Sequence, residues 1–433
     1  MTPQSTFMIL ATIVPEREAE LRALLDSMNL EPGLANAKNT VVPFGEFDQL
    51  HFARIVILDD QTLDDIEVYG LPRVDYPTYL AILGDLDGPV DELFKEMIQR
   101  AADGLRRIFR HCDDFGAAEP LLDWMKAHNV PPAANYVNWA GRTVKQVKEE
   151  ENLHLALERY LRENSASLLA TRPRQARDAL KAFVAAEQES GRVVLTKPDS
   201  TPWGWQVRNF VNLVGIPILL LIASPLLLIA LPFFLVLLRW HELSDPEVAP
   251  RVDPAHADLL SSLEDHDVTN QFSAMGSLKP GWFRRLTIGF VLGAIDYTAR
   301  HVFNRGRLAR VTTIQFARWV YLDGKKRVIF LSNYDGSLES YMDDFINKVG
   351  FGLNIVFSNG LGYPRTNWLV LDGAKDEQAF KDYLRRHQIP TQFWYNAFPG
   401  LTAHDKRRNA LIREGLEKGR MTDSEIEQWL RLF

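Results

Sequence analysis

Residues 51–59 read HFARIVILD, and this pattern returns later in the chain as QFARWVYLD at residues 315–323. Each copy is rich in β-branched and aromatic side chains, which favour a β-strand. A second apolar stretch follows in both copies and ends in Asp-Gly, at residues 87–88 and 335–336. Asp-Gly after a strand is typical of a turn, and an amphipathic helical pattern follows each turn. The sequence therefore predicts the same strand–strand–helix unit twice.

A further pair of matching segments follows each of these units. The segment DWMKAHNVP at residues 123–131 is similar to DYLRRHQIP at residues 382–390. At the same spacing, three residues of the first copy match three of the second; these are Tyr136, Gly141 and Thr143, which match Tyr395, Gly400 and Thr402. Matching blocks that occur in one order indicate a tandem duplication inside the chain.

The order of the expected elements predicts an α+β fold. It resembles the ferredoxin-like plan, in which strands and helices form an antiparallel sheet covered by helices. The resemblance covers roughly residues 5–150 and 308–405 and rests on strand order. It implies that the two units pair their sheets as a pseudo-dimeric α+β barrel.

An apolar segment lies between the two copies. Residues 209–238 contain no charged side chain and consist mostly of Leu, Ile, Val, Phe, Ala and Pro. A membrane-spanning helix needs about 20 apolar residues, so this segment is long enough to enter a bilayer. A buried core helix is the alternative interpretation, although three prolines would be unusual there. Aromatic and basic residues flank the segment, as expected at a lipid–water boundary; they are Trp203, Trp205, Arg208, Arg239 and Trp240.

A single crossing between the two copies would place them on opposite sides of the bilayer, where they could not share a barrel. Pro225 lies near the middle of the apolar segment and indicates a helical hairpin. Each arm of about 12 residues would reach roughly 18 Å, which is enough to enter one leaflet but not to cross. The sequence therefore predicts a monotopic, re-entrant insertion. The expected domains are a first unit with C-terminal helices at residues 1–170, an insertion at 171–307, and a second unit with C-terminal helices at 308–433.

Two segments of opposite charge follow the apolar one inside the insertion. Residues 242–267 contain eight acidic side chains and one basic side chain, which predicts a solvated acidic loop. Residues 282–303 have apolar residues near helical spacing together with Arg284 and Arg285, which predicts a basic amphipathic helix at the membrane surface. A surface helix packed on the barrel is the alternative. A basic face attracts anionic lipid headgroups by about 1 kcal/mol per residue.

Composition limits the classes of function. The chain has 433 residues with 49 basic and 56 acidic side chains, and its formal net charge of −7 does not favour nucleic acid as a partner. Its single cysteine, Cys112, excludes an intrachain disulfide and any thiolate-rich metal site. A reducing compartment fits this composition, so the main body is expected on the cytoplasmic side of a membrane.

One short motif suggests a chemistry. Residues 84–88 read GDLDG and are similar to the Gly-x-x-Asp-Gly motif of dye-decolourising peroxidases, which are haem enzymes built from duplicated ferredoxin-like units. The resemblance implies that Asp87 would work on the distal side of a haem. The chain departs from that family, because the second copy reads SNYDG, no proximal histidine can be assigned, and a membrane insertion is not part of the family's plan. A turn and helix cap is the alternative interpretation, and no metal ligand set is assigned.

The strand that contains HFARIVILD supplies two more candidate catalytic residues, His51 and Arg54. The second copy has Gln315 in place of His51, and a histidine at a position that differs between copies could serve as a ligand or general base. A buried structural histidine is the alternative. Arginine binds carboxylates and phosphates by two parallel hydrogen bonds. The candidate substrate-binding residues belong to the second copy and are Arg318, Asp335 and Tyr395.

These patterns predict a membrane-attached oxidoreductase, in its sharpest form a haem-dependent one, that acts on a lipophilic or fatty-acid-derived substrate. The alternative is a non-catalytic lipid-binding or scaffold protein that recruits a partner enzyme to the membrane. Membrane lipids are the expected partners in both cases. The candidate membrane-interface residues are Trp203, Trp205, Arg208, Pro225, Arg239, Trp240, Arg284 and Arg285.

Overall fold

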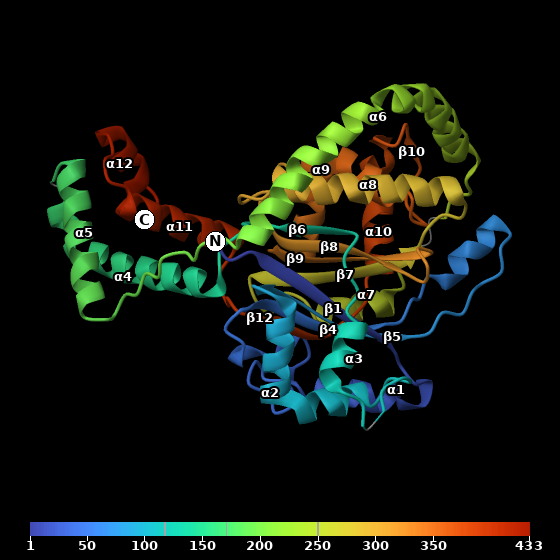
Figure 1. The fold of residues 1–433 in the computed structure, drawn as a ribbon, viewed down its shortest axis with the longest axis horizontal. Coiled ribbons are helices and arrows are strands. Elements are labelled where there is room, and N and C mark those ends of the chain that lie inside the picture. Colours follow the sequence, from blue (N-terminus) through green and yellow to red (C-terminus); the bar gives the residue numbers. More distant parts are fainter. Residues whose placement is uncertain (117, 170, 249–250) are drawn as a thin grey trace.

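The computed structural model describes the chain except for residues 117, 170 and 249–250. It is an α+β structure with two four-stranded antiparallel sheets (Figure 1). The first sheet has the order β1 (Gln4–Thr12), β5 (Tyr79–Asp87), β4 (Leu50–Leu58) and β12 (Thr391–Asn396). The second has the order β6 (Ala134–Val137), β8 (Ile314–Leu322), β9 (Arg327–Asp335) and β7 (Thr269–Ser277). Two small hairpins are β2 (Asn29–Glu31) with β3 (Leu34–Ala35), and β10 (Thr366–Asn367) with β11 (Leu371–Asp372).

Each large sheet takes one edge strand from the distant half of the chain. Strand β12 pairs with β4, and β6 pairs with β8. A shared apolar layer contains residues of both sheets, such as Val56 and Leu83 from the first and Val320 and Leu331 from the second, so the sheets pack face to face. Both sheets stay open within the described residues. The two sheets therefore do not form a closed barrel, because each ends in a borrowed edge strand and does not continue into the other sheet, and the barrel pairing expected from the sequence is not confirmed.

Helices cover the outer face of each sheet. The first sheet packs against α1 (Glu18–Asp26), α2 (Val90–Phe109) and α3 (Leu121–Ala127). The second packs against α8 (Trp282–His301), α9 (Leu338–Phe357) and α10 (Glu377–His387). Short 3-10 helices complete the loops and are η1 (Pro15–Arg17), η2 (Phe44–Glu46), η3 (Leu63–Tyr69) and η4 (Gly373–Lys375).

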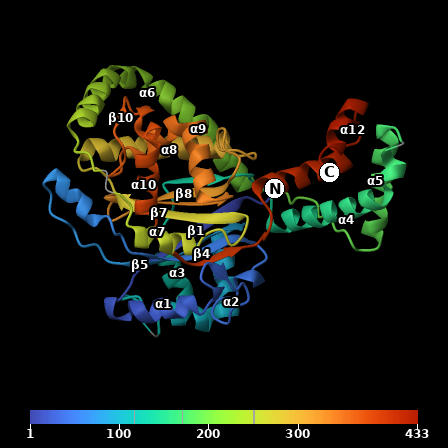
Figure 2. The same ribbon diagram turned by 180° about the vertical axis from the view of Figure 1, so that it is seen from behind.

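Four helices form a lobe that projects from one end of the sheets (Figure 2). They are α4 (Val144–Leu169), α5 (Pro173–Glu189), α11 (Ala403–Glu417) and α12 (Asp423–Leu430). The lobe has its own apolar core, which includes Leu157, Leu180, Ile412 and Trp429. Helices α4 and α11 lie side by side where the lobe joins the sheets.

The apolar segment forms a single helix, α6 (Trp203–Ser244), that curves over α8 as an arch (Figure 1). The two-armed helical hairpin expected from the sequence is therefore wrong, because the helix continues through all of its prolines. These are Pro217, Pro225 and Pro232. The prolines bend the helix and do not break it.

Substitute hydrogen bonds explain why the helix survives. A proline cannot donate to the carbonyl four residues earlier, so each one leaves a carbonyl free. The hydroxyl of Tyr297 on α8 donates to the Leu213 carbonyl (3.0 Å), which the first proline leaves free. The hydroxyl of Ser224 donates to the Leu221 carbonyl (2.7 Å), which the second leaves free. These two bonds supply the backbone partners that a helix needs in an apolar environment.

The acidic segment is not the solvated loop expected from the sequence. It contains the end of α6 and the helix α7 (Pro254–Ser262). Glu242 is buried, Asp245 pairs with buried Arg284 (2.5 Å), and Glu264 pairs with Arg385 (2.6 Å). Strand β7 also begins inside the range assigned to the insertion and forms an edge of the second sheet. Glu242, Asp245 and Glu264 therefore attach α6 and α7 to the sheet domain.

Candidate functional site

The two Asp-Gly carboxylates hold the N-termini of two helices of the lobe. Asp87, the last residue of β5, accepts a hydrogen bond from the Val144 amide at the start of α4 (2.7 Å). Asp335, the last residue of β9, accepts one from the Ala403 amide at the start of α11 (2.6 Å). The N-terminus of a helix has unpaired amides and a positive dipole, both of which favour a carboxylate. Each aspartate therefore joins the lobe to a sheet.

The second oxygen of each carboxylate contacts the residue that differs between the copies. His51 Nε2 lies 2.9 Å from Asp87 Oδ1, so the structure brings these two candidate residues together. In the second copy, the Gln315 amide donates to Asp335 Oδ1 (2.6 Å). The His51 ring is buried between the rings of Phe316 and Phe398, with centroids 5.4 and 5.6 Å away.

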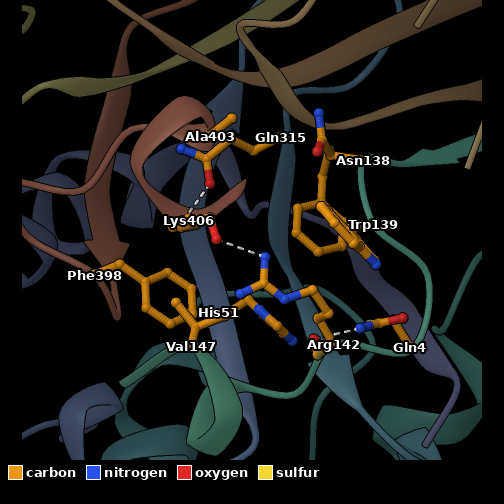
Figure 3. Close-up of a pocket in the computed structure, with 11 residues that line it drawn as sticks. Gln4, His51, Asn138, Trp139, Arg142, Val147, Gln315, Phe398, Ala403 and Lys406 are labelled. Atoms are coloured by element: carbon orange, nitrogen blue, oxygen red, sulfur yellow. Dashed lines mark hydrogen bonds between the residues drawn. The ribbon is translucent and has the colours of Figure 1, made fainter. Parts of the chain in front are cut away.

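A small cavity lies between His51, which contacts Asp87, and Gln315, which contacts Asp335 (Figure 3). It has a volume of about 40 Å³, and His51, Gln315, Phe398, Arg142 and Lys406 are among its lining residues. The Lys406 ammonium lies 3.9 Å from the centre of the Phe398 ring and donates to the Gln315 side-chain carbonyl. Burial lowers the pKa of Lys406 to about 7, and burial also raises the pKa of Asp335.

Sequence reasoning missed Lys406. It lies on α11, whose many charged residues are typical of a solvated helix. One signal was available, because the matching position at the start of α4 is Val147, and Val147 also lines the cavity. Lys406 and Val147 occupy matched positions of the two copies but differ in chemical type, as His51 and Gln315 do.

The size of the cavity limits its chemistry. A volume of about 40 Å³ holds roughly one water molecule, whereas small-molecule sites measure about 300–1,000 Å³. The haem implied by the peroxidase-like motif does not fit here, because both oxygens of Asp87 are bonded within the protein and the cavity is too small for a macrocycle. The described residues also contain no cluster of three or more side chains suited to hold a metal ion.

Arg54 and Arg318 join the two sheets and do not line the cavity. Arg54 on β4 donates to the Phe272 and Ser332 carbonyls of the second sheet, each at 2.8 Å. Arg318 on β8 donates to the Phe7 carbonyl of the first sheet (2.8 Å) and pairs with Asp85. Both guanidinium groups are buried. The catalytic role expected for Arg54 and the substrate-binding role expected for Arg318 therefore have no geometric basis, because their donors already bind the opposite sheet.

A polar chain links the two arginines. Arg54 donates to the Asn333 side-chain carbonyl, and the Asn333 amide donates to Asp85 (3.4 Å). Asp85 accepts from Arg318 in turn. One buried carboxylate therefore serves two buried cations, and burial together with the neighbouring Arg318 lowers the pKa of Arg54 to about 9.

Two other expected substrate-binding residues also have structural partners. The Tyr395 ring is buried in the core of the first sheet, 6.3 Å from the Phe44 ring, and it does not line the cavity. Burial raises its pKa to about 12. Asp335 caps α11, as described above, and accepts from the Thr269 hydroxyl (3.1 Å). Neither side chain reaches open space, so the expected substrate-binding roles are not supported.

Most of the predicted membrane-interface residues lie on or near the surface of α6. Trp203, Arg208, Pro225 and Trp240 are exposed, and Trp205 and Arg239 are half-buried. Arg285 on α8 is exposed as well. Arg284 is the exception. Its side chain is buried against Asp245, so it cannot face lipid headgroups.

Exposed apolar side chains surround the arch. The segment of α6 with the highest hydropathy has no buried residue, and α6 is the one helix among the described residues that is long and apolar enough to cross a membrane. Neighbouring elements add exposed apolar residues, which are Trp282, Leu286 and Phe290 on α8 and Trp368, Val370 and Leu371 at the β10–β11 hairpin. Exposed apolar surface of this extent marks a site that contacts a membrane or another protein.

The end of α6 is attached to that hairpin. The Glu242 carboxylate accepts hydrogen bonds from the Trp368 amide (2.9 Å) and the Leu369 amide (2.7 Å). Both of these residues have positive φ angles, which are unfavourable for large side chains. The buried glutamate therefore holds Trp368 at the surface beside α6. Comparison of the chain with protein-family models, with curated proteins and with solved structures finds no match.

Proposed function

We propose that this protein is monotopic, with the apex of α6 in one leaflet of a membrane and the sheets and lobe on a single side. The exposed arch is the observation that carries the proposal. One arm of α6 contacts α8 through Leu213 and Tyr297 (3.0 Å), and the other contacts it through Phe234 and Phe283 (ring centroids 5.2 Å apart). Both ends of the apolar helix therefore return to the same body.

The dimensions of the arch fit one leaflet. Between Leu213 and Phe234 the path along α6 is about 32 Å, whereas the base along α8 between Phe283 and Tyr297 is about 21 Å. If the arch is treated as a triangle with two sides of about 16 Å on this base, its apex lies about 12 Å above the base. One leaflet of the hydrocarbon core is about 15 Å thick. The apex would thus lie near the middle of the bilayer without crossing it.

The main body belongs on the cytoplasmic side in this proposal. Arg208 and Arg239 lie at the two ends of the apolar segment, and basic residues next to membrane segments are retained on that side. The single cysteine, Cys112, is buried and free, which suits a reducing compartment.

We further propose that the protein is a non-catalytic lipid-binding or scaffold protein. The polar groups expected to be catalytic are bonded to each other, and the cavity beside them has a volume of about 40 Å³. A lipophilic substrate would need a much larger space. The geometry thus favours attachment over the oxidoreductase chemistry. In this proposal the lobe, which projects from one end of the sheets, is available to a protein partner (Figure 1).

A tandem duplication of ferredoxin-like units accounts best for the architecture. The sheets have the orders β1-β5-β4-β12 and β7-β9-β8-β6, so each element of one has a counterpart at the same position in the other. The contacts are also reciprocal, because Arg54 and Arg318 each bind the opposite sheet, and Asp87 and Asp335 each cap a lobe helix. Exchange of the fourth strand between units, β12 for β6, would join the two copies.

Maleimide labelling in sealed vesicles tests the topology. Three single variants, Lys197→Cys before α6, Leu226→Cys beside Pro225 and Asp258→Cys after α6, place a thiol at exposed positions. The native Cys112 should not react with the maleimide, because burial raises the pKa of its thiol to about 12. We expect a water-soluble maleimide to label both flanking cysteines from the same side and to leave the apex unlabelled until detergent is added. Labelling of the two flanks from opposite sides would overturn the monotopic proposal.

A further inference from the structure

A pocket beside the start of α8 combines cations with an apolar rim. It lies between η3 with its following loop, the end of β7 and the first turn of α8, and its volume is about 250 Å³. The cations that line it are Lys279, Arg285 and Lys326, and the apolar rim includes Leu71, Val74 and Tyr76. Its described lining contains no carboxylate.

The positive charge of this pocket is poorly compensated. Arg285 and Lys326 form no ion pair with any described residue. Lys279 Nζ lies 3.7 Å from Asp245, but that carboxylate is already paired with Arg284 at 2.5 Å. Burial, followed by the charge of Arg284, lowers the pKa of Lys279 to about 8. An anion in the pocket would therefore relieve repulsion among the cations.

The start of α8 adds to this preference. Pro280 lines the pocket, and α8 begins at Trp282. The N-terminus of a helix carries a partial positive charge, which favours an anion nearby. Together with three cations, it makes a phosphate ester the best-matched ligand.

The position of the pocket selects a lipid as the source of that phosphate. The His241 ring at the end of α6 stacks on the Phe283 ring (centroids 5.0 Å apart), two residues before Arg285. His241 follows Trp240, which belongs to the aromatic belt expected at the headgroup level. The rim residues Leu71 and Val74 are 42% and 43% exposed, so they would meet the acyl region beside the headgroup.

We propose that this pocket binds the phosphate of an anionic phospholipid, with the apolar rim against the adjoining glycerol and acyl groups. The inference rests on the proposed membrane attachment and adds a lipid preference to it. The cations that would pair with the phosphate are Lys279, Arg285 and Lys326.

Vesicle flotation with a matched pair of double variants tests the preference. The site variant is Arg285→Gln with Lys326→Gln, and the control variant is Arg300→Gln with Lys325→Gln. The control removes the same charge from the same helix and the same turn, but neither residue lines the pocket. Each protein is added to phosphatidylcholine vesicles with and without phosphatidylglycerol.

We expect the native protein to prefer the anionic vesicles and the site variant to lose most of that preference. The loss expected when both pocket cations are removed is roughly 30-fold. The control should change by about threefold or less, since exposed charges outside the pocket are screened by salt. All of the proteins should bind phosphatidylcholine alone to the same extent through α6.

Four outcomes would overturn the inference. Equal losses in the two double variants would mean that the attraction is diffuse. Competition by inorganic phosphate alone, without a preference for anionic vesicles, would assign a soluble phosphate in place of a lipid. Binding to phosphatidylcholine with no anionic preference would refute the lipid site while leaving the proposed attachment intact, whereas absence of binding to any vesicle would refute both.

Discussion

A charge placed at the apex of α6 should abolish membrane attachment. Ile222 is 74% exposed on the arch, so replacement by arginine creates no cavity in the folded protein. The apex is expected about 12 Å above the base of the arch, close to the middle of the bilayer. At that depth arginine costs about 2.5–3.5 kcal/mol, whereas isoleucine contributes about −0.3 to −0.6 kcal/mol. The variant should therefore lose about 3–4 kcal/mol of membrane affinity, which is a factor of more than about 100.

The assay is flotation with phosphatidylcholine vesicles, in which electrostatic attraction is absent. Far-UV circular dichroism should show the same helix content in Ile222→Arg and the native protein, because no buried contact is lost. Leu155→Arg is the matched control, since Leu155 is 45% exposed on α4 in the lobe. It should float as the native protein does. If Ile222→Arg also floated with native affinity, the apex would not lie in the hydrocarbon and the reasoning would be refuted.

Two further predictions concern the interior. Asp85→Asn removes the buried carboxylate that pairs with Arg318 and is linked to Arg54 through Asn333, and it should lower the free energy of unfolding by about 3–5 kcal/mol in urea titrations. Asp296 is half-buried and pairs with the exposed Arg300 on the same helix (3.1 Å), so Asp296→Asn should cost less than about 1 kcal/mol, and similar losses for both variants would contradict the buried network. Lys406 has a pKa of about 7 when folded and about 10.4 when unfolded, so the unfolded state binds more protons between these values and stability should rise with pH across that window. The free energy of unfolding should rise by at most about 1.4 kcal/mol per pH unit, and Lys406→Met should remove this rise. If the variant kept the same pH dependence, Lys406 would be charged in the folded protein.

Several elements were predictable because their signals are local. The pattern HFARIVILD lies in β4 as far as Leu58, and QFARWVYLD lies in β8 as far as Leu322. Both Asp-Gly pairs end strands and precede helices, as turn chemistry requires. Residues 282–303 contain a helix, as expected from the spacing of their apolar residues. Alternation of apolar residues and turn residues depends on the segment itself, and therefore it can be read without the rest of the chain.

Strand β7 was missed because its side chains are unusual for a buried strand. It reads TNQFSAMGS and contains several buried polar residues. Ser273 accepts from Arg54 of the other sheet (3.0 Å), and Gln271 accepts from the Thr391 hydroxyl (2.6 Å). These partners are distant in sequence, so no local pattern could show that the polar residues would be satisfied after burial.

The candidate site was predictable in its members but not in their roles. His51 and Asp87 were identified from separate patterns and lie 2.9 Å apart. Lys406, on a helix with a solvated pattern, completes the surroundings of the cavity. A sequence shows which groups are ionisable, but the available volume and the bonds already made depend on packing. That packing left about 40 Å³ and turned both carboxylates into helix caps.

The sequence by itself determined that one segment of this chain is too apolar to be exposed to water, because hydropathy is a sum over neighbouring residues. It also determined the matching strand–turn–helix segments. Only the tertiary structure decided that the segment is one curved helix, since the Tyr297 and Ser224 hydroxyls replace the hydrogen bonds that its prolines remove. It alone decided that Arg54 and Arg318 bind the opposite sheets. Whether a charged or polar group is free or already bonded depends on partners that are hundreds of residues away, and folding brings those partners together.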